Sequence, residues 1–207
     1  TWANAPDDRK VMIAWMNNWD YAPACPPSAW KSAYTLPREL SLRKKGTHWV
    51  LCSEPVKELD ALAGAWKETA PAMENIGGDY ADAWEAKITL SLANDATITL
   101  SNKYGNEYVI RVNAQQRIIY CDRGGRTGEF NFSTLFAVPS MSAPIEGNEQ
   151  YLTLDIVVDQ SSVELFAGEG STCFTNTVYP RCIYRNIAVD GVVTEMKVRT
   201  LETIWKP

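Results

Sequence analysis

The chain has 207 residues, of which 45% are hydrophobic, so it is long enough to bury one substantial core. Its formal net charge of −5 argues against a nucleic-acid-binding protein, because contact with phosphates requires clustered Lys and Arg. No apolar run approaches the roughly 20 residues that a membrane-spanning helix needs. We therefore expect no nucleic-acid partner and no membrane span.

An apolar run at 11–16 lies near the start of the chain, and alternating runs recur from about residue 83 to its end, a pattern typical of many antiparallel strands. The Pro-rich segment 22–27 cannot donate ladder hydrogen bonds, so it separates the first strand from the rest. We place a domain boundary there, which gives domains at 1–27 and 28–207. Strands are expected near 9–16, 33–43, 47–53, 83–92, 96–102, 106–113, 116–121, 151–158, 162–167, 173–178, 183–189 and 192–204.

Turn residues stand between these runs. Asn94-Asp95 and Gly105-Asn106 tolerate positive φ, so 83–113 is expected to form consecutive hairpins. Asp159 marks a further tight turn, and Asp190-Gly191 predicts another hairpin. One short helix is expected within 54–63, and 122–150 is expected to be a loop with one short strand. Because successive hairpins must cover an apolar face, two sheets packed face to face are the predicted solution.

The cysteines and the single histidine give little sign of chemistry. The five cysteines are Cys25, Cys52, Cys121, Cys173 and Cys182. They are odd in number and form no C-x-x-C pair, so we interpret them as small buried hydrophobes, with disulfides in an exported protein as the alternative. His48 has no second histidine with which to build a metal cluster and is interpreted as a strand residue.

Several motifs follow one another in an order found in one enzyme family. The first is Trp15-Met16-Asn17-Asn18-Trp19-Asp20-Tyr21-Ala22, followed by Trp30 and Leu36-Pro37-Arg38-Glu39-Leu40. Later come Tyr120-Cys121-Asp122-Arg123, Gly128, Phe130, the segment 154–166, Phe174-Thr175 and Tyr179-Pro180. This set resembles glycoside hydrolase family 32, at the junction between a five-bladed catalytic propeller and a C-terminal β-sandwich. The resemblance implies an all-β chain: a two-sheet antiparallel sandwich of jelly-roll or concanavalin-like type, preceded by a strand of the last propeller blade.

The resemblance also implies that the catalytic carboxylates lie upstream, on the propeller. The family spells their motifs Trp-Met-Asn-Asp-Pro-Asn-Gly, Arg-Asp-Pro and Glu-Cys, and none of these is in this chain. Trp15-Met16-Asn17-Asn18 is only a near match, because Asn18 would put an amide where a nucleophilic carboxylate is needed. We therefore assign no catalytic residue, and we predict that this chain alone is inactive.

Asn18 and Trp19 are the substrate-binding candidates. The resemblance implies that their motif borders the funnel that holds the terminal fructose. There a Trp ring would face sugar C–H groups and an Asn amide would match a hydroxyl. The alternative is that Trp15, Trp19 and Tyr21 pack the seam between propeller and sandwich.

Four acidic residues are the other candidates for chemistry. Glu39 stands beside Arg38 and is interpreted as salt-bridged structure. Asp155, Asp159 and Glu164 flank one turn, which could bring their carboxylates together. A calcium site would need more oxygen ligands than this turn offers, so no metal is expected.

The resemblance implies a function for the longer protein of which we expect this chain to be the C-terminal part. That protein should hydrolyse β-fructofuranosyl bonds of levan, inulin or sucrose with retention, without a cofactor. The sandwich should stabilise its partner, the protein's own catalytic propeller. The alternatives are a carbohydrate-binding accessory module, a homo-oligomer surface and a stand-alone lectin. The resemblance favours export, and it predicts an exposed apolar strip at Val11, Ile13 and Trp15.

Overall fold

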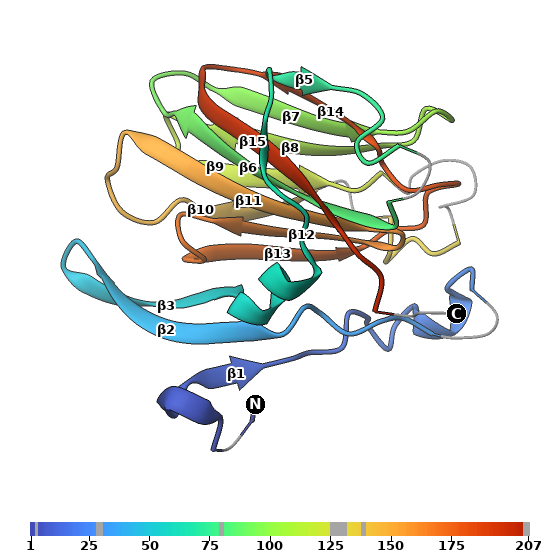
Figure 1. Ribbon diagram of the computed structural model, residues 1–207, viewed down its shortest axis with the longest axis horizontal. Helices are drawn as coiled ribbons and strands as arrows, with labels where there is room; N and C mark the ends of the chain where they lie inside the picture. Colours follow the sequence, from blue (N-terminus) through green and yellow to red (C-terminus); the bar gives the residue numbers. More distant parts are fainter. Residues whose placement is uncertain (3, 28–30, 79–80, 125–131, 138–139, 205–207) are drawn as a thin grey trace.

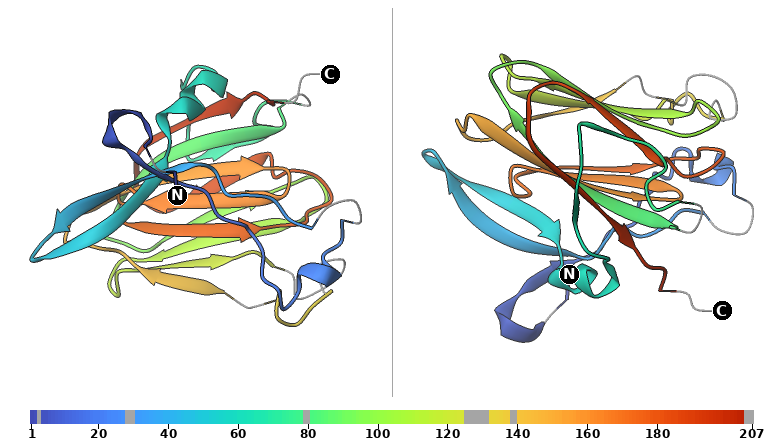
Figure 2. Two further views of the ribbon diagram at one scale, coloured as in Figure 1. Left: turned by 90° about the horizontal axis from the view of Figure 1, so that it is seen from below. Right: turned by 45° about the horizontal axis from the view of Figure 1, so that its top comes forward.

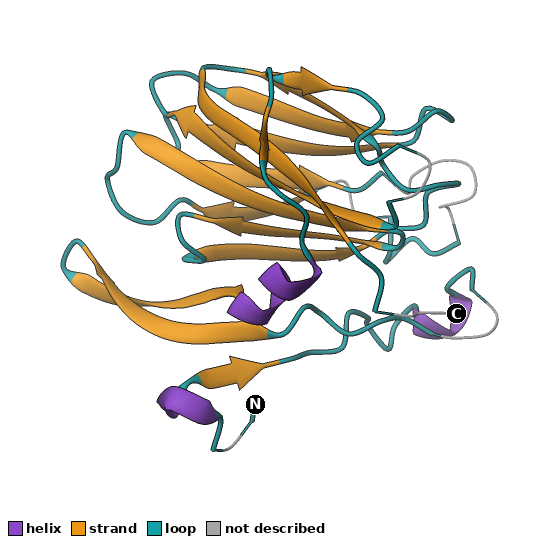
Figure 3. Cartoon of the chain, in the orientation of Figure 1, coloured by secondary structure: helices purple, strands orange, loops and turns teal. Residues whose placement is uncertain are grey.

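The computed structural model describes residues 1–2, 4–27, 31–78, 81–124, 132–137 and 140–204, and strands dominate it (Figure 3). The predicted landmarks Trp30, Gly128 and Phe130 lie outside the described residues. The described strands form one three-stranded sheet and two six-stranded sheets (Figure 1). The all-β sandwich predicted from the sequence is confirmed.

The three-stranded sheet is N-terminal, and we call it the N-terminal sheet. Its order is β1 (Lys10–Met12), β2 (Arg38–Lys45) and β3 (His48–Pro55), all antiparallel. The first strand is shorter than predicted, since Trp15 makes only an isolated bridge with Tyr34. The pairing of β1 with β2 spans the Pro-rich segment, which contains the 3-10 turn η2 (Ala22–Ala24). Another 3-10 turn, η1 (Pro6–Asp8), precedes β1.

Each six-stranded sheet forms one layer of the sandwich. The layer nearer the N-terminal sheet, here the seam sheet, has the order β13 (Thr172–Thr177), β12 (Ser162–Ala167), β11 (Tyr151–Asp159), β6 (Ala83–Ser91), β15 (Val193–Leu201) and β4 (Lys67–Glu68). The other layer, here the far sheet, has the order β10 (Met141–Pro144), β9 (Ile118–Asp122), β8 (Glu107–Asn113), β7 (Ala96–Ser101), β14 (Asn186–Asp190) and β5 (Ala72–Met73).

Most predicted strands recur within a few residues of their expected bounds. The short helix expected within 54–63 is the 3-10 helix η3 (Lys57–Leu62), and the strand expected in the long loop is β10. Two strands, β4 and β5, were not predicted. Each has only two residues, which is too short for an alternation to be recognised.

Two predicted hairpins are wrong. β6 lies in the seam sheet and β7 in the far sheet, so the turn at 92–95 crosses between the layers. The Asp190-Gly191 turn also crosses, from β14 to β15. The two crossings lie side by side, where Ser91 N–H donates to Val192 C=O and a Cβ at Gly191 would come within 2.6 Å of the Ala96 Cβ. Turn residues specify a chain reversal; they do not specify which sheet the next strand joins.

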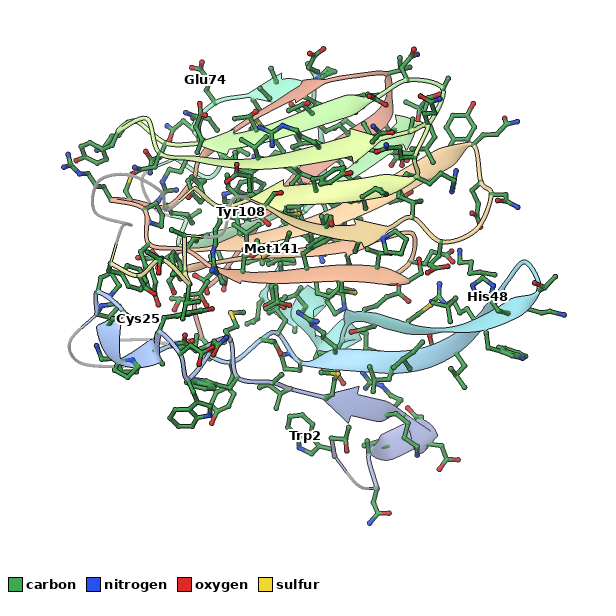
Figure 4. All side chains as sticks on the ribbon, turned by 180° about the vertical axis from the view of Figure 1, so that it is seen from behind. Trp2, Cys25, His48, Glu74, Tyr108 and Met141 are labelled. Atoms are coloured by element: carbon green, nitrogen blue, oxygen red, sulfur yellow. The ribbon has the colours of Figure 1, made fainter. Side chains whose placement is uncertain are left out.

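Alternation builds the main core between the two layers. In β6, Trp84, Ala86, Ile88 and Leu90 are all fully buried, whereas Lys87 between them is only partly covered. Tyr108 from β8 lies in the same interior (Figure 4) and accepts a 2.7 Å hydrogen bond from Asn176 Nδ2. The row of inward residues on every long strand therefore faces the opposite sheet.

The outer face of the seam sheet is also covered. The N-terminal sheet and η3 lie against it, on the side away from the far sheet (Figures 1 and 2). A second, smaller apolar cluster lies there, formed by Leu59, Val157, Phe166 and Leu201. The chain is thus arranged in three layers, and the seam sheet packs on both of its faces.

Candidate functional site

Residues 15–25, which we call the aromatic turn, carry the two predicted substrate-binding residues. The rings of Trp15 and Trp19 have centroids 4.9 Å apart, and Trp19 is 81% exposed. Asn18 is exposed beside them, and its Oδ1 accepts the Asp20 N–H at 2.9 Å. Exposed indole faces next to an amide are groups that can contact a polyhydroxylated ligand.

Hydrogen bonds within the aromatic turn close it at its base. Cys25 is 2% exposed, and its Sγ accepts from Asn17 Nδ2 at 3.5 Å and lies 3.7 Å from Tyr21 C=O. Ala22 N–H donates to Asn18 C=O at 2.8 Å. Tyr21 N–H also donates to Asn18 C=O, at 3.2 Å, so backbone hydrogen bonds link residues 21 and 22 directly to Asn18.

The sandwich contacts the base of the aromatic turn. Thr177 Oγ1, in β13, donates to Met16 C=O. The ring of Tyr21 packs edge-on against Phe136, with centroids 5.4 Å apart. The Arg123 guanidinium lies 3.7 Å from the Phe136 ring centroid and 5.8 Å from that of Tyr21. Tyr21 therefore packs on the sandwich, as the alternative to substrate contact predicted for it.

A buried ion pair joins the N-terminal sheet to the seam sheet. Arg38 of β2 donates to Glu164 and Thr175, and both charged side chains are less than a tenth exposed. The other oxygen of Glu164 accepts the Leu36 N–H at 2.8 Å. Burial raises the pKa of Glu164, and the neighbouring Arg38 opposes that rise. Such a pair fixes the register of two surfaces more than it stabilises them, because desolvation offsets much of the attraction.

The free edge of β3 makes a second junction. Ser53 N–H donates to Gly170 C=O at 2.9 Å, and Cys173 Sγ donates to Ser53 C=O at 3.2 Å. A Cβ at Gly170 would lie 2.3 Å from Ser53 C=O, so only glycine permits this approach. The N-terminal sheet is therefore held at β2 and at β3.

The structure gives each of the predicted carboxylates Glu39, Asp159 and Glu164 a separate partner, although the Asp159 charge contributes to the raised pKa of Glu164. Glu39 pairs with Arg9 at 2.8 Å, as salt-bridged structure, and Glu164 pairs with Arg38. Asp159 accepts the N–H of Gln160, the next residue, within the β11–β12 turn.

Asp155 instead lies in a charged cluster that sequence reasoning missed. Lys87 Nζ is 3.4 Å from Asp155 and 3.9 Å from Glu85, while Arg199 donates to Glu85 at 2.5 Å and pairs with Asp60 at 2.7 Å. Burial and the Glu85 charge raise the pKa of Asp155 to about 7. The Glu85 side chain is 2% exposed, so this pair cannot reach a glycosidic bond of a polymer. Glu85 and Lys87, the charged residues at alternate outward positions of β6, were the feature of the sequence that could have indicated this cluster.

The remaining candidates are structural in position. His48 begins β3 (Figure 4), and its Nε2 lies 3.2 Å from a carboxylate oxygen of Glu146. All five cysteines are unpaired; Cys25, Cys52 and Cys121 are buried as predicted, whereas Cys173 and Cys182 are only partly buried. Across the described ranges, no three His, Cys, Asp or Glu side chains gather as metal ligands.

No helix within the described residues has the length and apolar character needed to cross a bilayer.

Two family models match the chain end to end. The model described as "Glycosyl hydrolases family 32 N-terminal domain" matches residues 1–55, and "Glycosyl hydrolases family 32 C terminal" matches residues 54–205. The two matches meet at the end of β3.

The similar curated proteins include enzymes named levanase, raffinose invertase and extracellular exo-inulinase. A levanase of Bacillus subtilis is 30% identical over 99% of this chain, and an extracellular exo-inulinase of Aspergillus awamori is 26% identical over 89% of it. The chain spans only 33% and 37% of these relatives, about a third of their length. The Aspergillus awamori exo-inulinase structure matches with a TM-score of 0.79 at 22% identity, over 94% of this chain and 41% of that one. A β-fructofuranosidase of Schwanniomyces occidentalis gives 0.76 at 20% identity, over 93% and 45%.

Proposed function

Because this chain belongs to glycosyl hydrolase family 32, we propose that it is the non-catalytic C-terminal part of a retaining β-fructofuranosidase. The whole protein would hydrolyse β-fructofuranosyl bonds of levan, inulin or sucrose, and its sandwich would stabilise the catalytic propeller. The observation that carries the proposal is the double junction at β2 and β3, which fixes the N-terminal sheet on the seam sheet. A retaining glycosidase needs two carboxyl groups about 5–5.5 Å apart facing the substrate, and the acidic residues Glu39, Asp155, Asp159 and Glu164 are occupied elsewhere.

Fructose release tests this proposal. The 207-residue chain is assayed on levan, inulin and sucrose beside a longer protein that carries a complete family 32 N-terminal domain. We expect fructose only from the longer protein. Fructose released by the short chain would contradict the proposal and would identify this chain as catalytic.

The partner that we propose for the N-terminal sheet is the remainder of the protein's own propeller. Leu42, Trp49 and Leu51 lie on one face of the β2–β3 hairpin and are each 60–67% exposed. Ile13 and Trp15 are each 37% exposed beyond it. Apolar side chains grouped in this way favour contact with another packed surface. Light scattering distinguishes a homo-oligomer, which would bury the same face, from a monomer.

We also propose that Asn18 and Trp19 contact the substrate. Trp19→Ala in the longer protein should raise KM for a short fructan about tenfold with little change in kcat, as expected when binding shared by substrate and transition state is lost. Tyr151→Ala, which removes an aromatic ring that is 55% exposed on β11, is the control. Equal effects of the two substitutions would refute the assignment.

A second candidate function, carbohydrate binding by the sandwich itself, is favoured by one hollow. It has a volume of about 590 Å³, and its lining residues include Asn75, Gln160, Asn186 and Arg185. Amides and guanidinium groups are common partners of sugar hydroxyls. Affinity electrophoresis of the chain in levan or inulin, with Gln160→Ala as the variant, tests it: retardation that the substitution removes supports binding, and unretarded wild-type chain refutes it.

We further propose that the protein is exported. The support is the exo-inulinase relatives, which are named as extracellular enzymes.

A further inference from the structure

We propose that Arg123 is a positioning residue for the substrate-facing aromatic turn and that it acts through Tyr21. The inference rests on the proposed function, because it assigns the sandwich a direct part in shaping the substrate site. Arg123 lies after β9 on the sandwich, whereas Asn18 and Trp19 lie in the segment matched by the N-terminal family model.

The Arg123 guanidinium is held rigidly on the sandwich side. Its Nη2 donates to Phe136 C=O at 2.8 Å, and its Nη1 lies 3.5 Å from Thr177 C=O. The same group lies flat enough on Phe136 to come within 3.7 Å of the ring centroid. Arg123 is 9% exposed, so these contacts are shielded from water and a cation–π contact there is stronger than at the surface.

Tyr21, from the aromatic turn, packs against both Arg123 and Phe136. Its ring meets Phe136 edge-on at 5.4 Å and lies under the guanidinium at 5.8 Å. Phe136 in turn packs against Tyr179, with centroids 5.6 Å apart, so the platform has little freedom to shift. The position of Tyr21 is therefore set by sandwich residues.

Backbone hydrogen bonds of the aromatic turn link the position of Tyr21 to that of the exposed residues Asn18 and Trp19. Tyr21 N–H and Ala22 N–H both donate to Asn18 C=O, at 3.2 and 2.8 Å. Trp19 is the next residue, and at 81% exposure it has few contacts of its own beyond Trp15. Loss of the Arg123 stack should consequently loosen Asn18 and Trp19 while the strands of the sandwich stay folded.

Hydrogen exchange of the 207-residue chain tests the structural half. Arg123→Gln removes the stack; Arg123→Lys keeps the charge without the planar group. Arg111→Gln, on the exposed face of β8, is the control. We expect amides at 21–22 to exchange about tenfold faster in Arg123→Gln, and less so in Arg123→Lys, with β11 and β12 unchanged. Unchanged exchange at 21–22, or equal acceleration in every strand, overturns the inference.

Kinetics of the longer protein test the functional half. We expect Arg123→Gln to raise KM for a short fructan about tenfold, with kcat changed less than about twofold. A fall in kcat with KM unchanged overturns the positioning role. If wild-type longer protein releases no fructose at all, the proposed function fails, and the exchange result still decides whether Arg123 orders the turn.

A double-mutant cycle shows whether Arg123 acts through Tyr21. Tyr21→Leu should raise KM by a similar factor, and the double variant should be no worse than either single variant. Effects that multiply would mean that the two residues act independently and would overturn the proposed route.

Discussion

The two faces of the seam sheet pack by different physics. The inner face is mostly apolar, with side chains such as Ile88, Leu154 and Ile156 fully buried against the far sheet, and its buried Asn176 is hydrogen-bonded to Tyr108. The outer face mixes a small apolar cluster around Val157 with the buried Arg38–Glu164 pair. Apolar packing between the layers is insensitive to partner identity, whereas a buried ion pair is satisfied only by its own partner. The inner face therefore supplies stability, and the outer face supplies the register of the N-terminal sheet.

The largest expected effect comes from breaking the ion pair on one side only. Glu164→Ala leaves Arg38 buried without a carboxylate, which should lower the free energy of unfolding by about 3–5 kcal/mol. Denaturant unfolding of the chain measures it. Arg38→Met combined with Glu164→Leu should recover most of that loss, because no charge is then left buried. A double variant as unstable as Glu164→Ala would refute the register role.

Substitutions at two neighbouring residues of β11 compare the stability contributed by the two faces. Ile156 points inward and is fully buried, and Val157 points outward and is 4% exposed. Ile156→Ala should cost about 2–5 kcal/mol of unfolding free energy, and Val157→Ala should cost less, since the smaller cluster can relax. Chemical denaturation measures both. A larger loss at Val157 would show that the outer face carries the stability.

The charged cluster around Asp155, on the outer face of the seam sheet, should make the stability of the chain depend on pH. The pKa of Asp155 in the folded chain is about 7, against an ordinary value near 3.8. Between these values the folded chain holds a proton that the unfolded chain has released, so unfolding free energy should fall as pH rises from about 4 to about 7. Asp155→Asn should make this slope smaller and leave the part that the raised pKa values of Asp159 and Glu164 contribute, as followed by thermal melting at successive pH values. An unchanged slope in the variant would show that another group titrates.

The smallest effect is expected at an exposed pair. Glu195 lies 2.7 Å from Lys197 on β15, and its side chain is 49% exposed. Glu195→Gln should change unfolding free energy by less than about 1 kcal/mol, because solvent screens the pair. A loss comparable with that of Glu164→Ala would undermine the distinction between buried and surface charges, and the same denaturation series decides it.

The inner face was predictable from sequence and the outer face was not. Alternation at Trp84, Ala86, Ile88 and Leu90 predicts a strand with one buried row, and the structure confirms it. Alternation does not say what covers the other row, so Glu85 and Glu164 gave no sign of their partners Arg199 and Arg38, which are more than a hundred residues away.

The aromatic turn shows the same limit. The motif at 15–22 located Asn18 and Trp19, and the resemblance assigned them a setting. Neither the motif nor the resemblance revealed that Arg123 and Phe136, more than a hundred residues later, pack against Tyr21. The two failed hairpins at 92–95 and 190–191 have a related cause, since local turn chemistry carries no information about the sheet that a strand will join.

The most direct test of the account measures melting and catalysis together in the longer protein with Glu164→Ala. Glu164 pairs with Arg38 between the seam sheet and the N-terminal sheet, and we expect it to take no part in catalysis. We therefore predict that the melting temperature falls by several degrees, as a loss of this size requires, while kcat measured well below that temperature stays within about twofold of wild type. An unchanged melting temperature with kcat reduced a hundredfold or more would contradict the account and would place Glu164 among the catalytic carboxylates.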